Sequence, residues 1–139
     1  MIGIFPGTFD FLHPGHLKAI REAHDQCDCL VIALQVDASI RPDKNPPVFT
    51  PSERYWMLGA CRWVDEIVPY STEDELVSML KFYAPCVRFL GEDWKDKDYT
   101  GRDVEGIKTV FLSRQHDWSS SNIRARLNPD TAKDVVMLQ

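Results

Sequence analysis

Two histidines, His13 and His16, stand three residues apart where a short apolar segment gives way to a turn rich in glycine and proline. Pro14 lies between them and suits the first turn of a helix, where the missing proline N–H leaves no hydrogen bond unmade. Residues three apart on a helix share one face. Because the N–H groups at a helix start lack partners within the helix, together with two imidazoles they form a site suited to a polyphosphate.

The turn before the histidines, residues 5–10 (FPGTFD), offers further backbone donors. We expect Thr8 and Phe9 to present N–H groups to phosphate, and Gly7 to let the chain approach the ligand closely. Asp10 is acidic beside an anionic site, so it either makes a local turn or meets a hydroxyl, a lysine or Mg²⁺. The turn thus extends the predicted phosphate site.

Three consecutive serines, residues 119–121, begin a second predicted helix. Their hydroxyls and free N–H groups suit the β- and γ-phosphates of a triphosphate, although a single serine there could simply cap the helix. Arg114 precedes them and could clamp a phosphate with two parallel hydrogen bonds. Arg124 and Arg126 follow on the helix, and we interpret them as mostly solvated, with the alternative that Arg124 faces the site.

The composition narrows the class of protein. The chain has 139 residues, is 44% hydrophobic and 27% charged, and carries a net charge of −5. This acidic balance argues against a general nucleic-acid surface, so an anionic ligand must be held by local positive groups. No apolar run approaches a membrane span, and no signal peptide is expected. The four cysteines fit no zinc or C-x-x-C motif, which favours free thiols and a cytoplasmic protein.

The elements that position these residues follow a regular alternation. Apolar runs predict strands at 2–5, 29–36, 66–70, 86–90 and 107–112, and helical spacing predicts helices at 14–26, from 52 to about 63, from 72 to before Pro85, and from 119 to before Pro129. We expect a single α/β domain over 1–139, with a Rossmann-like parallel five-stranded sheet and helices on both faces. Residues 129–139 form a C-terminal extension of uncertain structure. The ligand should bind where the strands' carboxyl ends converge.

Four segments, in order, resemble a known family. Residues 7–16 (GTFDFLHPGH) resemble the nucleotidyltransferase superfamily with the H-x-G-H signature. Residues 62–68 (RWVDEIV) are similar to the R-Y-V-D-E-V segment of the glycerol-3-phosphate cytidylyltransferase-like family, residues 91–94 (GEDW) to its G-D-D-W, and residues 114–123 (RQHDWSSSNI) to its R-T-E-G-I-S-T-T-x-I. The resemblance covers about residues 2–127.

This resemblance implies transfer of CMP from CTP to a phosphorylated polyol or alcohol, with release of pyrophosphate, by a homodimer that needs Mg²⁺ held mainly through the triphosphate. The implied catalytic residues are His13, His16, Lys44 and Arg114. Those implied for nucleotide binding are Gly7, Thr8, Phe9, Gly15, Arg62, Gly91, Ser119, Ser120 and Ser121. Those implied for the acceptor are Asp10, Asp37, Lys44, Arg54, Asp93 and Trp94. The sequence shows no dedicated metal cage.

Several of these roles have structural alternatives. Arg54 and Arg62 lie eight apart, so on one helix they would share a face, and salt bridges at a helix edge are the other interpretation. Trp94 could line the base or acceptor site or simply pack, and Asp93 could accept from a ribose or acceptor hydroxyl. The charged residues 95–102 are either a solvated loop or a lid.

Departures from the family pattern leave the acceptor open. The loop at 37–50 holds one lysine and one arginine where the glycerol-3-phosphate enzymes are lysine-rich, and Asp117 and Trp118 replace a glycine and an isoleucine. Adenylyl transfer from ATP to a sugar or pantetheine phosphate is therefore the second prediction. A non-catalytic nucleotide-binding module is the third.

Overall fold

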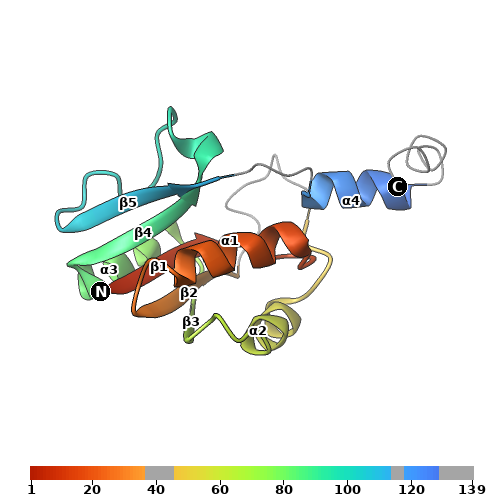
Figure 1. Cartoon of the computed structure of the whole chain (residues 1–139), viewed down its shortest axis with the longest axis horizontal. Helices are drawn as coiled ribbons and strands as arrows, with labels where there is room; N and C mark the ends of the chain where they lie inside the picture. The colour runs from red at the N-terminus through yellow and green to blue at the C-terminus, as the bar shows by residue number, and fades with distance from the viewer. Residues whose placement is uncertain (37–45, 114–117, 129–139) are drawn as a thin grey trace.

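Five parallel strands form one sheet in the computed structural model, which describes residues 1–36, 46–113 and 118–128. The strands are β1 (Ile2–Gly7), β2 (Cys29–Gln35), β3 (Glu66–Tyr70), β4 (Cys86–Gly91) and β5 (Ile107–Leu112), in the order β3-β2-β1-β4-β5 (Figure 1). The order reverses between β1 and β4, so the switch point expected of a Rossmann-like sheet lies beside the first strand. The predicted fold class is confirmed.

The described residues also form four α-helices and one short turn of 3₁₀ helix, of which all but the last helix lie between strands. They are α1 (Pro14–His24), α2 (Pro51–Gly59), α3 (Glu73–Tyr83), η2 (Glu92–Trp94) and α4 (Ser120–Leu127). Figure 1 shows α1 in front of the sheet, α3 behind it and α4 extending from the end where the strands finish.

Most predicted boundaries hold within two residues, but α2 ends at Gly59 rather than near Trp63. Glycine lowers helix propensity by about 1 kcal/mol, and the helix stops there. Cys61, Trp63 and Val64 nevertheless pack against the core. Their apolar spacing mimicked a longer helix, which is why the prediction overran.

The helix starts are capped by their own first turns. At α2 the Thr50 side chain accepts from the Glu53 N–H, and Glu53 accepts from the Thr50 N–H in return. At α3 the Thr72 side chain likewise accepts from the Glu75 N–H. The Glu75 carboxylate, however, accepts from the Ser71 N–H, so the reciprocal bond of a capping box is shifted by one residue.

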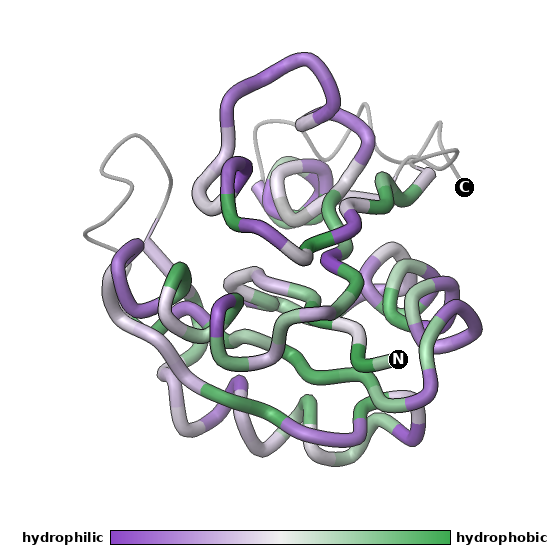
Figure 2. The backbone as a smooth tube through the Cα atoms, turned by 90° about the vertical axis from the view of Figure 1, so that its left-hand side faces the viewer, coloured by the Kyte–Doolittle hydropathy of each residue, from purple (hydrophilic) through white to green (hydrophobic). Residues whose placement is uncertain are grey.

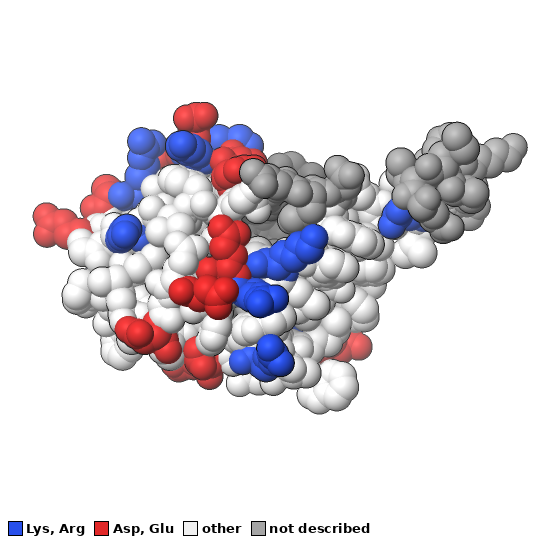
Figure 3. Space-filling model, viewed as in Figure 1, with Lys and Arg blue, Asp and Glu red and all other residues white. Residues whose placement is uncertain are grey.

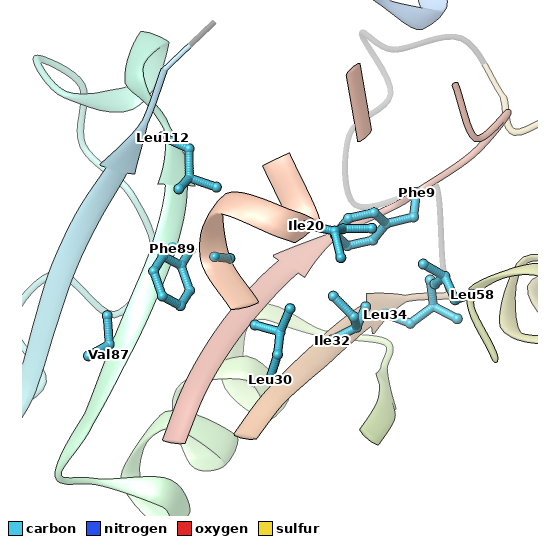
Figure 4. Packing of buried hydrophobic residues seen from close by; sticks show 10 residues of the cluster. Phe9, Ile20, Leu30, Ile32, Leu34, Leu58, Val87, Phe89 and Leu112 are labelled. Atoms are coloured by element: carbon cyan, nitrogen blue, oxygen red, sulfur yellow. The ribbon is translucent and has the colours of Figure 1, made fainter. Parts of the chain in front are cut away.

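The core lies on both faces of the sheet. On one face α1 and α2 contribute Ile20 and Leu58 to a cluster with Phe9 and Phe89 (Figure 4). On the other face α3 packs against a second cluster of strand residues. The hydrophobic stretches of the backbone lie in the middle of the molecule, and the outer loops are mostly hydrophilic (Figure 2). Helices thus cover both faces, as predicted from the continuous apolar runs.

The sheet parts along its middle towards the carboxyl ends of the strands. β1 pairs with β2 up to Gly7, but its registered pairing with β4 consists of Gly3 with Val87 and Ile4 with Arg88. β4 in turn stays paired with β5 up to Gly91. Beyond Ile4 and Arg88 the two central strands therefore separate, which opens space between the halves of the sheet.

Candidate functional site

A cleft of about 540 Å³ lies at this end of the sheet, within the range of small-molecule sites. It is bounded by the ends of β1 and β4 and by the starts of α1 and α4. The residues lining it that the sequence had singled out for binding are Gly7, Thr8, Phe9, Asp10, His13, Gly15, His16, Gly91, Trp94, Ser119 and Ser121. The loops after several strands thus converge, and the segments around His16 and Ser119 border one cleft.

The two imidazoles are fixed by the helix start they belong to. His13 is the N-cap of α1, and its Nδ1 accepts from the Gly15 N–H at 3.1 Å. His16 Nδ1 accepts from the His13 N–H at 3.3 Å, and the two rings lie 3.9 Å apart between centroids. Because each Nδ1 accepts, Nε2 carries the hydrogen in the neutral rings. Each ring can therefore donate one N–H to a ligand oxygen.

The turn between β1 and α1 is held in a constrained conformation. Phe9 has φ of 49° although it is not glycine, and its ring is buried in the core. A side chain at Gly7 would come within 2.9 Å of that ring. Gly7 is thus required for packing, in addition to its predicted role near a ligand. The surrounding core pays for the strain at Phe9, as is usual of turns at functional sites.

Asp10 ties three distant segments together. Its carboxylate, 7% exposed, accepts from the Val48 N–H at 2.8 Å and from the Phe49 N–H at 3.0 Å. Arg124 Nη2 donates to the same carboxylate at 3.2 Å and lines the cleft. The interpretation of Arg124 as mostly solvated was wrong. It lies one turn beyond the start of α4, on the side that faces the cleft.

Arg54 is buried and bonds to the backbone rather than lining the cleft. Its Nη1 donates to the Thr8 carbonyl at 2.8 Å and to the Gln35 carbonyl at 2.6 Å, and its Nε donates to the Phe49 carbonyl at 3.2 Å. Burial lowers the pKa of the Arg54 guanidinium, and the nearby Asp10 carboxylate opposes that shift. The structure thus corrects the predicted role of Arg54: instead of contacting the ligand, Arg54 supports the turn at residues 5–10, which we call the phosphate turn after its predicted role.

Arg62 does not share a face with Arg54, because α2 ends at Gly59. Arg62 is exposed, its guanidinium lies 5.3 Å from the Trp63 ring centre, and it does not border the cleft. Asp93 is also exposed and outside the lining, whereas Gly91 and Trp94 on either side of it are within it. The predicted roles of Arg62 and Asp93 find no geometric support.

The serines at the start of α4 divide between capping and lining. The Ser119 side chain accepts from the Asn122 N–H at 3.0 Å, so the capping alternative holds for this residue. Ser119 and Ser121 both line the cleft, and Ser120 begins the helix. Asp37, Lys44 and Arg114 lie outside the described residues, so their predicted roles stay predictions.

Some cleft residues carried a signal that the motif search did not use. Gln35 and Arg88 are polar residues within otherwise apolar strands, and both line the cleft. Ser113 follows β5 with a buried hydroxyl that makes no hydrogen bond. The Trp118 ring lies 6.5 Å from the His13 ring at an interplanar angle of 22°. It thus extends the wall formed by the imidazoles.

Charges of both signs are interspersed on the face seen in Figure 3, where the coloured residues form no long positive stripe. Within the described ranges, no group of three His, Cys, Asp or Glu side chains is arranged to hold a metal ion. The helices described are all too short or too polar to cross a bilayer.

Comparison with known proteins agrees with this geometry. The family model described as "Cytidylyltransferase-like" matches residues 4–126. The ethanolamine-phosphate cytidylyltransferase of Dictyostelium discoideum is 36% identical over 129 residues, covering 87% of this chain and 35% of that protein. The bifunctional protein HldE of Caulobacter vibrioides is 33% identical over 132 residues, covering 91% of this chain and 27% of that protein. The chain thus spans about a third of the length of these curated relatives.

A solved structure shares the fold. The lipopolysaccharide core biosynthesis protein from Thermoplasma volcanium GSS1 superposes with a TM-score of 0.64 at 21% identity, covering 81% of this chain and 94% of that one. At this identity the likeness concerns the arrangement of the sheet and helices alone.

Proposed function

Because the chain belongs to the cytidylyltransferase-like family, we propose that it transfers a nucleotidyl group from a nucleoside triphosphate to a phosphorylated alcohol. An acceptor phosphate oxygen attacks the α-phosphorus, the bond from that phosphorus to the bridging oxygen breaks, and pyrophosphate leaves. The nucleotide is CTP, and the acceptor is a phosphorylated polyol or alcohol of the glycerol 3-phosphate kind.

The observation that carries this proposal is the meeting of two helix starts at one cleft. α1 brings His13 and His16, and α4 brings Ser119 and Ser121. Helix starts offer partial positive charge and N–H donors, which suit a triphosphate. Phosphoryl chemistry of this kind depends on positioning and charge neutralisation rather than on a protein nucleophile.

The proposed roles are supported by the site's geometry for the residues that the structure describes, and by the family resemblance for Lys44, Arg114 and Mg²⁺. The Nε2–H groups of His13 and His16 stabilise charge as it builds on the phosphate oxygens. Lys44 and Arg114 add positive charge at the α-phosphate and at the leaving pyrophosphate. Mg²⁺ binds mainly through the triphosphate oxygens and offsets their charge. Asp10 and Arg124 fix the walls of the cleft against one another.

Adenylyl transfer from ATP is the second candidate, because identity does not favour one set of relatives. The chain is 36% identical to the ethanolamine-phosphate enzyme and 33% identical to the HldE protein. The segments at 62–68 and 91–94 support CTP by their likeness to cytidylyltransferase motifs.

Pyrophosphate release tests the proposal directly. The full chain with Mg²⁺ is supplied with CTP or ATP and a panel of phosphorylated polyols, alcohols and sugars. Release with CTP and a phosphorylated alcohol supports the proposal, and release with ATP alone moves the chain to the second candidate. If both nucleotides protect against thermal unfolding but neither releases pyrophosphate, a binding module is the better description.

The assembly is proposed to be a homodimer. Tyr55 and Trp56 on α2 are 50% and 79% exposed, which leaves apolar area for a second copy. Light scattering after size exclusion measures the mass of the assembly, and a monomeric mass at micromolar concentration rejects this part of the proposal.

A further inference from the structure

Arg88 is a buried cation in the wall of the cleft that the proposed phosphate site does not use. Its side chain comes from the middle of β4 and is 2% exposed. Nη1 donates to the Thr100 carbonyl, and the guanidinium lies 5.0 Å from the Tyr99 ring centre. Its Nε is buried and makes no hydrogen bond to any residue that the structure describes. A buried donor without a partner is destabilising, so a ligand that supplies an acceptor is favoured.

The position of Arg88 places it at the bottom of the split in the sheet. It is registered with Ile4 at the last paired position of β1 and β4. Val87 and Phe89, its neighbours along the strand, belong to the cluster on the α1 face. The Arg88 side chain therefore lies on the α3 face. Three residues separate it from the end of β4, so it lies roughly 10 Å below the strand ends.

The groups around Arg88 are polar but do not neutralise it. Tyr70, Glu73, Tyr99 and Thr100 line the same part of the cleft. Among the described residues, no carboxylate lies within ion-pair distance of Arg88; Glu73 acts on it from farther away. Burial lowers the pKa of the Arg88 guanidinium, and Tyr99, Tyr70 and Glu73 oppose that shift. An arginine nevertheless stays charged in a protein.

The proposed reaction divides the cleft between its two substrates. The triphosphate occupies the starts of α1 and α4, where His16 and Ser119 lie. The acceptor must bring its phosphate to the α-phosphorus from the remaining side. Away from those helix starts, the lining includes residues of α3 and β4 together with Tyr70 and residues 99–100. We place the remote end of the acceptor in this part of the cleft, beside Arg88 and Glu73.

We propose, resting on the proposed function above, that Arg88 determines which acceptor binds. The acceptor is recognised by the chemical group at the end of its molecule remote from its phosphate. That group is a hydroxyl, which accepts from Arg88 and donates to Glu73 at once. An ammonium in the same place would meet a buried like charge. The chain therefore takes polyol phosphates and discriminates against phosphorylated amino alcohols.

Paired ligands test this assignment. Binding of glycerol 3-phosphate and ribitol 5-phosphate is measured by calorimetry on the full chain with Mg²⁺ and the α,β-methylene analogue of CTP, which cannot release pyrophosphate. Each acceptor is measured beside an analogue whose terminal hydroxyl is replaced by ammonium. In the unmodified chain at least one polyol phosphate binds roughly 10-fold or more tighter than its ammonium analogue. Arg88→Met weakens polyol binding by roughly 10-fold and narrows that gap, since a charge-assisted hydrogen bond is lost.

The controls separate this inference from a folding defect and from the proposed function. Arg102→Met removes an exposed arginine whose guanidinium lies 6.0 Å from the same Tyr99 ring, and it leaves acceptor binding unchanged. Protection by CTP against thermal unfolding verifies that Arg88→Met is folded. If that variant does not fold, Arg88→Lys, which keeps the charge but loses Nε, weakens polyol binding in its place.

Equal binding of polyol and amino-alcohol phosphates overturns the inference, as does unchanged polyol binding in the folded Arg88 variant. Failure to bind any acceptor of the panel also overturns it. Acceptor binding without pyrophosphate release rejects the proposed function alone, because calorimetry does not depend on turnover.

Discussion

At the start of α1, two histidines have a structural role in addition to the chemical role proposed for them. The Nδ1 atoms of His13 and His16 complete a capping box that other proteins build from serine or threonine with a glutamate or glutamine. The hydrogen-bearing Nε2 atoms then take a defined direction. The sequence predicted that these two histidines lie together at a helix start, but not this use of Nδ1, because histidine is not a usual N-cap residue.

Two substitutions at His16 separate these tasks. His16→Ala removes both the cap and the donor, so we expect the free energy of unfolding to fall by about 1 kcal/mol and turnover to fall roughly 10²-fold. Glutamine is a natural third residue of a capping box, so His16→Gln should recover the stability while turnover stays well below that of the unmodified chain. Denaturant unfolding and pyrophosphate release measure the two effects. Near-full activity in either variant removes His16 from the mechanism.

At the scale of elements, the chain keeps its phosphate turn in place through side chains from distant segments. α2 supplies Arg54, which holds the carbonyl groups of Thr8 and Gln35. α4 supplies Arg124, which holds Asp10. The strands were predictable because their apolar runs are unbroken, and the ranges of β3 and β5 agree to the residue. The hydrogen bonds of Arg54 and Arg124 to distant segments were not predictable, because no local sequence pattern indicates which groups the fold brings together.

Arg54 and Arg62 form a matched pair for testing this support. Arg54→Met leaves one buried and two partly buried carbonyl groups without this donor, so we expect a loss of about 3 kcal/mol in the free energy of unfolding. Nucleotide affinity should fall with it, since the Thr8 turn loosens. Arg62→Met, at an exposed position, should change stability by less than about 0.5 kcal/mol. Urea unfolding and CTP titration measure both, and equal effects of the two substitutions contradict the assignment.

The bond between Asp10 and Arg124 predicts a coupling between the phosphate turn and α4. Arg124→Met and Asp10→Asn should each weaken CTP binding, by roughly 10-fold. Because both substitutions remove the same ion pair, the double variant should bind CTP no more weakly than the single variant with the lower affinity. Isothermal titration of the four proteins measures the coupling. Additive losses would show that the two residues act separately.

Over the whole molecule, the thiols predict how stability responds to alkaline pH. Burial is the first cause that raises the pKa values of Cys27, Cys29 and Cys86, and Asp65 adds to it at the first two. The folded chain thus holds these protons more tightly than the unfolded chain. The stabilisation is complete below the unfolded thiol pKa of about 8.5 and is lost as the pH rises through the folded values.

The free energy of unfolding should accordingly fall as the pH rises above about 8.5. Guanidinium unfolding at several pH values under reducing conditions measures this slope. Cys86→Ala should make the slope shallower, since it removes one of the shifted thiols. A free energy of unfolding that rises with pH across this window contradicts the expectation.

The shortened pairing between β1 and β4 divides the sheet into two halves that are joined along only part of their common border. One half consists of β1, β2 and β3, and the other consists of β4 and β5. A ligand bound in the opening would contact both halves and hold them together. Binding should slow amide hydrogen exchange on β4 and β5 as well as on β1, because one small ligand would reduce local opening across the whole sheet.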